Sequence, residues 1–177
     1  MSKFAIFMLG SLSYLIFGCD PVLAQSTEWR ISKTEWTPQD EKNYAAFVVR
    51  IGEKVEKRQC GSIRSCLASE ANVYRQSDPP NLQMRADCAD LPYVLRAYFA
   101  WKNGLPFSFA SDMQQRPVSG NFGDIRYSPQ GNQVSRKTDV VARGGYPSAV
   151  SLLNSVIPDQ TDSGNYRINY MGNDQGD

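Results

Sequence analysis

The strongest pattern of apolar and polar positions in the chain lies between residues 85 and 107. Apolar residues recur there at helical spacing, which predicts a buried helix. Its apolar face consists of Leu91, Val94, Leu95, Ala97, Tyr98 and Phe99. Asp87 stands where an N-cap is expected, and Asp90 suits the positive amino end of the helix dipole. Lys102, Gly104 and Pro106 form a stop signal, so the helix is expected to end before Gly104.

Pro92 leaves the first turn of this helix open. A helix that begins at Cys88 would lack the hydrogen bond from residue 92 to the Cys88 carbonyl, because proline has no amide hydrogen. If Pro92 is the first helical residue, Cys88 lies on the turn that leads in. Both versions place Cys88 near the amino end of a buried helix, where a thiolate is favoured.

A second helix is predicted after residue 36. Thr37 is its expected cap, Pro38 suits the first helical position, and acidic residues occupy the first turn. The helix is expected to end around Glu56. Its apolar stripe consists of Tyr44, Phe47, Val48, Ile51 and Val55. We interpret this helix as scaffold.

Loops and one further short helix are expected elsewhere. Residues 25–35 are an expected extended lead-in, and residues 60–72 an expected disulfide loop with a helical turn around Leu67. The Asp-Pro-Pro sequence at residues 78–80 predicts a loop before the central helix. Residues 148–156 predict a short buried helix.

Several segments alternate in the manner of strands. Leu105 to Ala110 is one of them, and residues 166–171 are another. Residues 124–128 and 133–141 predict a hairpin that turns at residues 129–132. Together with the helices, these strands indicate an α+β fold in which a central helix packs on a small antiparallel sheet.

The amino end predicts a signal peptide at residues 1–24. A basic residue precedes an apolar run, and Val22 and Ala24 are the small residues of a cleavage site after Ala24. The rival interpretation is a lipoprotein acylated at Cys19, and only then would we expect membrane attachment. Residues 25–177 form one domain by size, with a periplasmic or secreted location.

Charge and composition exclude several kinds of function. The chain has 19 basic and 18 acidic residues, a formal net charge of +1, and no histidine. This balance argues against nucleic-acid binding, which requires a basic face. Without histidine or a Cys-x-x-Cys motif, a zinc site is not expected. No phosphate-binding loop is present, so we expect no cofactor and no metal.

Three cysteines follow the predicted cleavage site. An oxidising compartment favours disulfides, and an odd number of cysteines leaves at least one of them without a partner in the chain. Cys60 and Cys66 flank a short polar loop that a disulfide can close. Their pairing leaves Cys88 as a free thiol. The alternatives are that Cys88 pairs with one of the other two, or that it is a small buried hydrophobic residue.

A nucleophilic thiolate needs partial exposure and normally a base within hydrogen-bond reach. The sequence has no histidine to act as that base. General-base activation would therefore fall to Asp87, Asp90 or a lysine. Tyr93, Arg96 and Trp101 are candidates for lining a cleft, although aromatic residues on a helix more often belong to the core.

The stretch from Asp87 to Phe107 resembles the core of the transglutaminase-like cysteine enzymes, a branch of the papain-like fold. The resemblance rests on Cys88, on residues 93–96, and on the Gly-Leu-Pro-Phe sequence at residues 104–107. In that family the nucleophilic cysteine opens a buried helix, and a Gly-Ile-Pro-like turn leads into the first core strand. The resemblance implies that Cys88 is the catalytic nucleophile. The stretch covers about twenty residues, and a Gly-Leu-Pro turn also arises simply as a helix cap.

The family completes its catalytic triad with a histidine and an Asp or Asn from later strands. No residue of this chain can take the histidine's role. Two explanations remain open. Either the chain is the front part of a longer protein whose base-bearing strands lie beyond Asp177, or it is an inactive relative that has kept the scaffold.

Two functions from different classes follow. The first is an exported cysteine hydrolase or acyltransferase in which Cys88 attacks an amide or peptide carbonyl. Its substrate would be a peptide or protein, such as a cell-wall peptide, with a backbone amide near the helix start stabilising the oxyanion. The second is a non-catalytic envelope protein that uses the same scaffold to bind a peptide or partner.

Overall fold

The computed structural model describes residues 27–116, 130–140, 145–146 and 148–161. The predicted signal peptide with its Ala24 cleavage site, the Cys19 alternative, the first hairpin strand at 124–128 and the strand at 166–171 lie outside these residues. Along the part of the chain that is described, helices and antiparallel strands are mixed, which is compatible with the predicted α+β class.

Helix α1 spans Pro38–Glu56, and its predicted start and end are confirmed. Thr37 forms a capping box, because its hydroxyl accepts from the Asp40 amide and the Asp40 carboxylate accepts from the Thr37 amide. Phe47 and Ile51 are buried as predicted, whereas Val55, which the stripe included, is 53% exposed. The last turn of the apolar stripe therefore faces away from the core.

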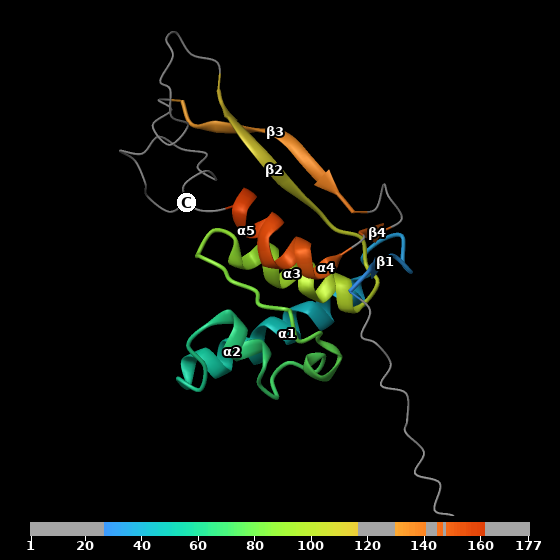
Figure 1. Cartoon of the computed structure of the whole chain (residues 1–177), viewed down its shortest axis with the longest axis vertical. Coiled ribbons are helices and arrows are strands. Elements are labelled where there is room, and N and C mark those ends of the chain that lie inside the picture. Colours follow the sequence, from blue (N-terminus) through green and yellow to red (C-terminus); the bar gives the residue numbers. More distant parts are fainter. Residues whose placement is uncertain (1–26, 117–129, 141–144, 147, 162–177) are drawn as a thin grey trace, which may run out of the picture.

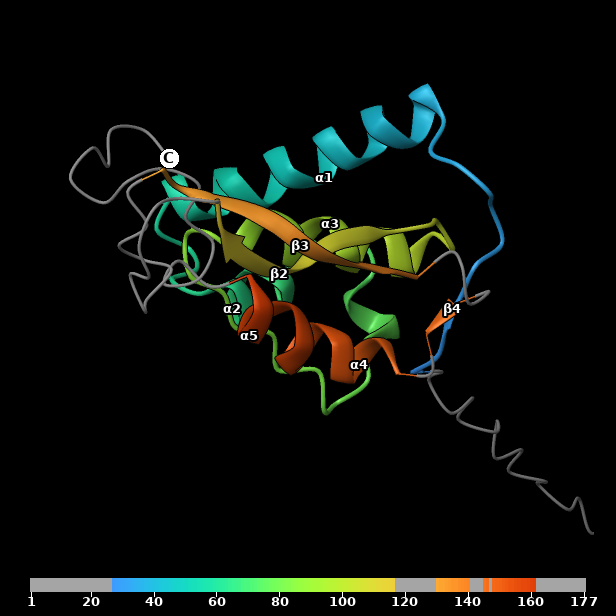
Figure 2. The ribbon, with the colours of Figure 1, turned by 90° about the horizontal axis from the view of Figure 1, so that it is seen from above.

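Helix α3 spans Leu91–Lys102 and lies at the centre of the fold. Figure 2 shows α1 on one side of α3 and the α4–α5 segment on the other, with β2 and β3 passing over them. The buried face of α3 extends over most of its length and includes Val94, Ala97, Tyr98, Phe99 and Trp101. The prediction of a buried central helix is confirmed.

Strands β2, Ser108–Gln115, and β3, Asn132–Asp139, form an antiparallel pair. The strand expected at residues 105–110 begins three residues later and continues further. The strand expected at 133–141 is confirmed over most of its length, and it pairs with β2. Figure 1 shows this ribbon lying across the helices.

The helix predicted at residues 148–156 begins where expected and is longer. It consists of α4, Ala149–Ser151, a π-helical segment, Leu152–Val156, and α5, Ile157–Gln160. The Ser148 hydroxyl caps its start. Pro158 lies within this longer helix. Because proline has no amide hydrogen, one backbone hydrogen bond of the helix is missing at Pro158. The wider π turn lies immediately before this position.

The expected lead-in contains a two-residue strand, β1, Trp29–Arg30, which pairs with β4, Gly145–Tyr146. Trp29 is fully buried, and its indole N–H donates to the Leu105 carbonyl at 3.1 Å. Since Trp29 also stacks on Phe107, this segment fixes the turn from α3 into β2.

Gly104 ends α3 with a φ of +61°, which is a conformation that favours glycine. Its carbonyl accepts hydrogen bonds from the amides of Ser32 and Lys33 at 2.9 and 3.0 Å. The predicted stop signal therefore also serves as the point where the lead-in segment is attached.

Helix α2, Ile63–Leu67, begins within the loop that the disulfide closes and ends one residue after it. Cys60 and Cys66 are bonded, as predicted, with their Cα atoms 5.1 Å apart. A 3-10 turn, Arg75–Ser77, and an extended segment then lead to α3. A papain-like arrangement of these elements remains a prediction.

Candidate functional site

Cys88 lies on the turn at residues 88–90, immediately before α3, and its side chain is exposed. Its sulfur is free, whereas Cys60 and Cys66 are bonded to each other. Both alternatives for Cys88, a disulfide with one of these two and a buried hydrophobic residue, are therefore wrong. The helix begins at Leu91, so Pro92 is its second residue rather than its first. Cys88 lies on the turn before the helix, as the second of the two predicted versions has it.

Asp87 is not the N-cap of α3, because that position belongs to Asp90. One Asp87 carboxylate oxygen instead accepts hydrogen bonds from the amides of Ala89 and Asp90 at 2.8 and 3.1 Å. The Asp87 carbonyl accepts from the Leu91 amide at 3.2 Å. Asp87 thus organises the turn that presents Cys88, three residues before the helix proper.

These hydrogen bonds decide which amides of the turn are available to a ligand. The amides of Ala89, Asp90 and Leu91 are already donated, and Pro92 has none. Within the described part of the chain, no acceptor is bonded to the backbone N–H of Cys88. That amide is therefore available to a ligand that lies beside the Cys88 sulfur.

A cleft of about 460 Å³ lies beside this turn. Asp87 and Asp90 line it together with Arg85 and Asp159, which form an ion pair at 2.8 Å. Asp90 is 3% exposed. Cys88 itself does not line this cleft, whose charged side chains are three carboxylates and one arginine that is paired across the cleft to α5.

A second cleft of about 520 Å³ lies along the first turns of α3, where Tyr93 and Arg96 line it, as proposed from the sequence. Trp101 does not, since it is 8% exposed and belongs to the core. The Arg96 guanidinium lies 3.8 Å from the centre of the Trp36 ring and donates to both Glu41 carboxylate oxygens at 3.0 and 2.6 Å. These hydrogen bonds lower the pKa of Glu41.

Prolines and aromatic side chains form most of the rest of this second cleft, and Ser108 and Asp139 complete it. Pro92 and Pro106 line it beside Trp36 and Phe107. The Trp36 indole N–H donates to the Pro106 carbonyl at 2.7 Å, so this donor is used within the fold. A ligand would bind in this cleft mainly through shape complementarity and apolar contacts.

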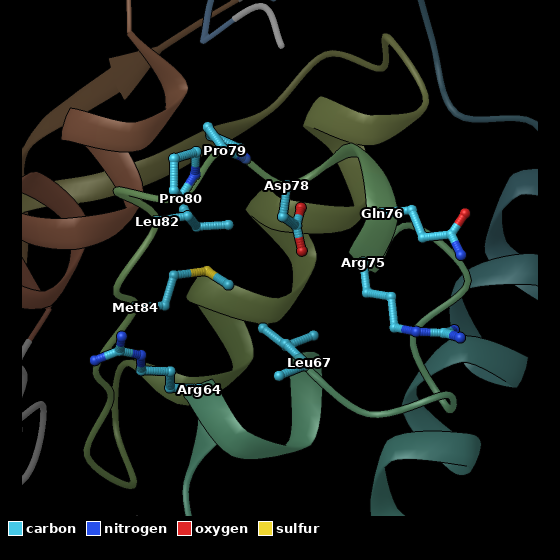
Figure 3. Close-up of a pocket in the computed structure, with 10 residues that line it drawn as sticks. Arg64, Leu67, Arg75, Gln76, Asp78, Pro79, Pro80, Leu82 and Met84 are labelled. Carbon is cyan, nitrogen blue, oxygen red and sulfur yellow. The ribbon is translucent and has the colours of Figure 1, made fainter. Parts of the chain in front are cut away.

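A third cleft, shown in Figure 3, lies between α2 and residues 75–84 and has a volume of about 360 Å³. Leu67, Leu82 and Met84 point toward one another inside it, and Arg64 and Arg75 lie on opposite sides. Both arginines are exposed. This cleft was not predicted from the sequence.

A buried polar cluster adjoins the third cleft. The Tyr98 hydroxyl lies 2.8 Å from each Asp78 carboxylate oxygen and accepts from the Asn72 amide at 2.8 Å. Lys102 lies 2.7 Å from Asp78. Burial, followed by the nearby Asp78 charge, raises the pKa of Tyr98 well above its usual value, while burial lowers the pKa of Lys102.

This cluster was not predicted from the sequence, because its members lie in separate segments. The available signal was the spacing of Tyr98 and Lys102, which are four apart on one helix and therefore share a face. Asp78 precedes two prolines, and the sequence alone identified it only as part of a loop. Its partners depended on how that loop packs.

The described residues contain no group of three or more Cys, Asp and Glu side chains placed to hold a metal ion. None of their helices combines the length and the apolar composition required to cross a bilayer.

The structure thus places Cys88 on the same turn as Asp90, directly after Asp87, as the sequence indicated. No protein-family model, curated protein or solved structure matches this chain.

Proposed function

We propose that the protein is an exported cysteine hydrolase or acyltransferase that acts on an amide or peptide bond through Cys88. The supporting observation is the position of this thiol. Cys88 is exposed and unbridged on the turn that opens the most deeply buried helix of the fold. The other two described cysteines, Cys60 and Cys66, are bonded. A free exposed thiol in a protein destined for an oxidising compartment calls for a chemical role.

The proposed reaction begins with attack of the Cys88 sulfur on the carbonyl carbon, after its proton has passed to an acceptor. The carbon–nitrogen bond then breaks, the leaving amine takes up that proton, and a thioester remains. Water completes hydrolysis, or an amine completes acyl transfer, and either step restores the thiol. The Cys88 backbone N–H would stabilise the oxyanion that forms in each attack.

The proton acceptor limits the rate that this chain can reach alone. It cannot be a histidine of these residues, because the sequence has none. Asp87 and Asp90 are the acceptors that share the turn with Cys88. A carboxylate is a much weaker base than an imidazole, so any turnover by this chain is expected to be slow.

The rate of alkylation of Cys88 tests the proposal. Folded protein is treated with iodoacetamide at mildly acidic pH, and N-acetylcysteine is treated in parallel. The proposal expects Cys88 to react at least about tenfold faster, because a nucleophilic cysteine carries a larger thiolate fraction. Peptide mapping assigns the label to Cys88 rather than Cys19, and Cys88→Ser must abolish it. Labelling no faster than that of N-acetylcysteine would contradict the proposal.

A second candidate is a non-catalytic envelope protein that binds a peptide or partner on the same scaffold. The observation that favours it is the cleft in which Trp36, Tyr93 and Phe107 meet two prolines, together with the lack of a histidine. Slow labelling of Cys88 in a protein that retains peptide binding would support this function over the enzymatic one.

A further inference from the structure

The cleft between α2 and residues 75–84 differs in charge from the cleft beside the turn that carries Cys88, in which three aspartates and one arginine are the charged residues. Arg64 and Arg75 are its basic side chains, and Asp78 is its carboxylate. Lys102 neutralises Asp78, since the two side chains are 7% and 17% exposed and lie 2.7 Å apart. The two arginines therefore leave the cleft with a net positive charge.

Few interactions within the described chain compete for these arginines. Arg64 makes no ion pair there, and its side chain is exposed. Arg75 donates one long hydrogen bond, 3.4 Å, to the Asn72 carbonyl. Arg75 also acts electrostatically on the Glu70 carboxylate, which Lys54 already binds. Both guanidinium groups point outward from the cleft in Figure 3, so they are available at its rim to carboxylates of a ligand, to which arginine binds with two donors at once.

The interior of the cleft is apolar. Leu67, Leu82 and Met84 point toward one another between the two arginines in Figure 3, and Pro79 adds to the apolar lining. A volume of about 360 Å³ is at the small end of ligand sites and suits one or two aliphatic side chains. The methionine can adjust its shape to such a guest.

We infer that this cleft binds a peptide segment in which apolar residues are flanked on both sides by acidic residues. The apolar side chains occupy the space above Leu67 and Met84, and the flanking carboxylates pair with Arg64 on one side and Arg75 on the other. The inference is independent of the chemistry of Cys88, because it holds for an enzyme and for a binding protein alike.

Fluorescence anisotropy of a labelled peptide tests this inference. The probe is fluorescein-labelled Glu-Leu-Leu-Glu, and the protein is the full chain with Cys88→Ser, so that no covalent step contributes. We expect saturable binding that weakens as salt is added, because the charge pairs lie at the rim. Two matched probes, Lys-Leu-Leu-Lys and Glu-Gly-Gly-Glu, are expected to bind at least about tenfold more weakly.

Charge reversal locates the site. Arg64→Glu and Arg75→Glu are each expected to weaken binding of the Glu-Leu-Leu-Glu probe about tenfold, because each places a carboxylate opposite another. Arg50→Glu is the control, since Arg50 is exposed on α1 and does not line the cleft. Circular dichroism checks that all three variants fold.

Three results would overturn the inference. The first is equal binding of the acidic and basic probes. The second is an equal effect of Arg50→Glu and the two cleft variants. The third is displacement of the peptide by laurate at equal or lower concentration, which would identify the occupant as a lipid anion rather than a peptide.

Discussion

The Lys102 ammonium lies 2.7 Å from a carboxylate oxygen of Asp78 in a position where both side chains are largely hidden from water. The ammonium also donates to the Ser77 carbonyl and lies 4.0 Å from the centre of the Trp101 ring. One end of the segment that precedes α3 is thereby fixed to the far end of that helix. The third cleft depends on this attachment, since Asp78 forms part of its wall.

Replacing Lys102 is therefore expected to destabilise the fold. Lys102→Met leaves the Asp78 carboxylate buried without its cation, which we expect to lower the free energy of unfolding by about 3 kcal/mol. Unfolding in guanidinium chloride measures the change. The double variant Lys102→Met, Asp78→Leu should regain part of the loss, because it removes the stranded charge. A single variant as stable as the original protein would contradict the importance of the pair.

The Tyr98 hydroxyl is expected to contribute through its hydrogen bonds rather than its ring. Tyr98→Phe removes the donor to Asp78 and the acceptor for Asn72, and should cost about 1–2 kcal/mol. Tyr44→Phe is the matched control, because the Tyr44 hydroxyl has no hydrogen bond among the described residues while its ring packs on Phe99. Thermal unfolding compares the two. Equal losses of stability in the two variants would mean that the hydrogen bonds of the Tyr98 hydroxyl do not contribute to stability.

Gly104 provides a test of the turn from α3 into β2. A methyl group there would collide with the Ser32 side chain and lie 3.3 Å from the Arg30 carbonyl oxygen, at a φ of +61°. Gly104→Ala should therefore cost about 2–3 kcal/mol. Adding Ser32→Gly should restore part of this loss by removing the collision.

Gly52 serves as the control for this substitution. It lies within α1, and nothing lies within 4 Å of a methyl group added there. Gly52→Ala should stabilise the protein by about 0.5–1 kcal/mol, because alanine favours a helix interior. If both alanine variants destabilise the protein equally, the explanation from the Gly104 geometry is wrong.

The lowered pKa of Asp40 is expected to make the stability of the fold depend on pH in the acidic range. Hydrogen bonds from Lys33 and then from Thr37 lower its pKa from 3.8 to about 2. Because the pKa is lower in the folded state, the stabilisation is complete above about pH 4 and is lost as the pH falls from there through about 2. Asp40→Asn should flatten this part of the stability profile. Glu35→Gln, at an exposed residue without a hydrogen bond in the described chain, should leave it unchanged.

The disulfide is expected to stabilise both the fold and the third cleft. Replacing Cys60 and Cys66 by alanine should cost about 2 kcal/mol, as expected from the entropy of so short a loop. The same change should weaken binding of the Glu-Leu-Leu-Glu probe, because Arg64 lies between the two cysteines. Anisotropy and urea unfolding test the two effects separately. Unchanged affinity in a destabilised protein would show that α2 keeps its position without the bond.

The helices were predictable because their signals are local. Thr37 and Pro38 mark the start of α1, and Lys102 and Gly104 mark the end of α3. The start of α3 was less certain, since two aspartates precede a proline within one turn. The structure shows that the Asp87 carboxylate accepts hydrogen bonds from the amides of the turn before α3, and that the helix begins at Leu91.

The strand pairing was not predictable in the same way. The pairing of β3 with β2 is between distant segments, and most side chains of β3 between Gln133 and Asp139 are exposed, so the pattern of burial gave little information on register. The third cleft was missed for a related reason. Arg64, Arg75 and Met84 come from three segments that only the packed loop brings together.

The pairing of β1 with β4 has a consequence for the order in which the chain can fold. Trp29 is synthesised early in translation. The carbonyl that accepts its indole N–H lies 76 residues later in the sequence, and the strand that pairs with β1 begins at Gly145. Native burial of this indole must therefore await nearly the whole described chain. Contacts of such high sequence separation slow folding and leave apolar surface open in the meantime. The emerging polypeptide should need a chaperone's protection at Trp29 for longer than at any position of α1.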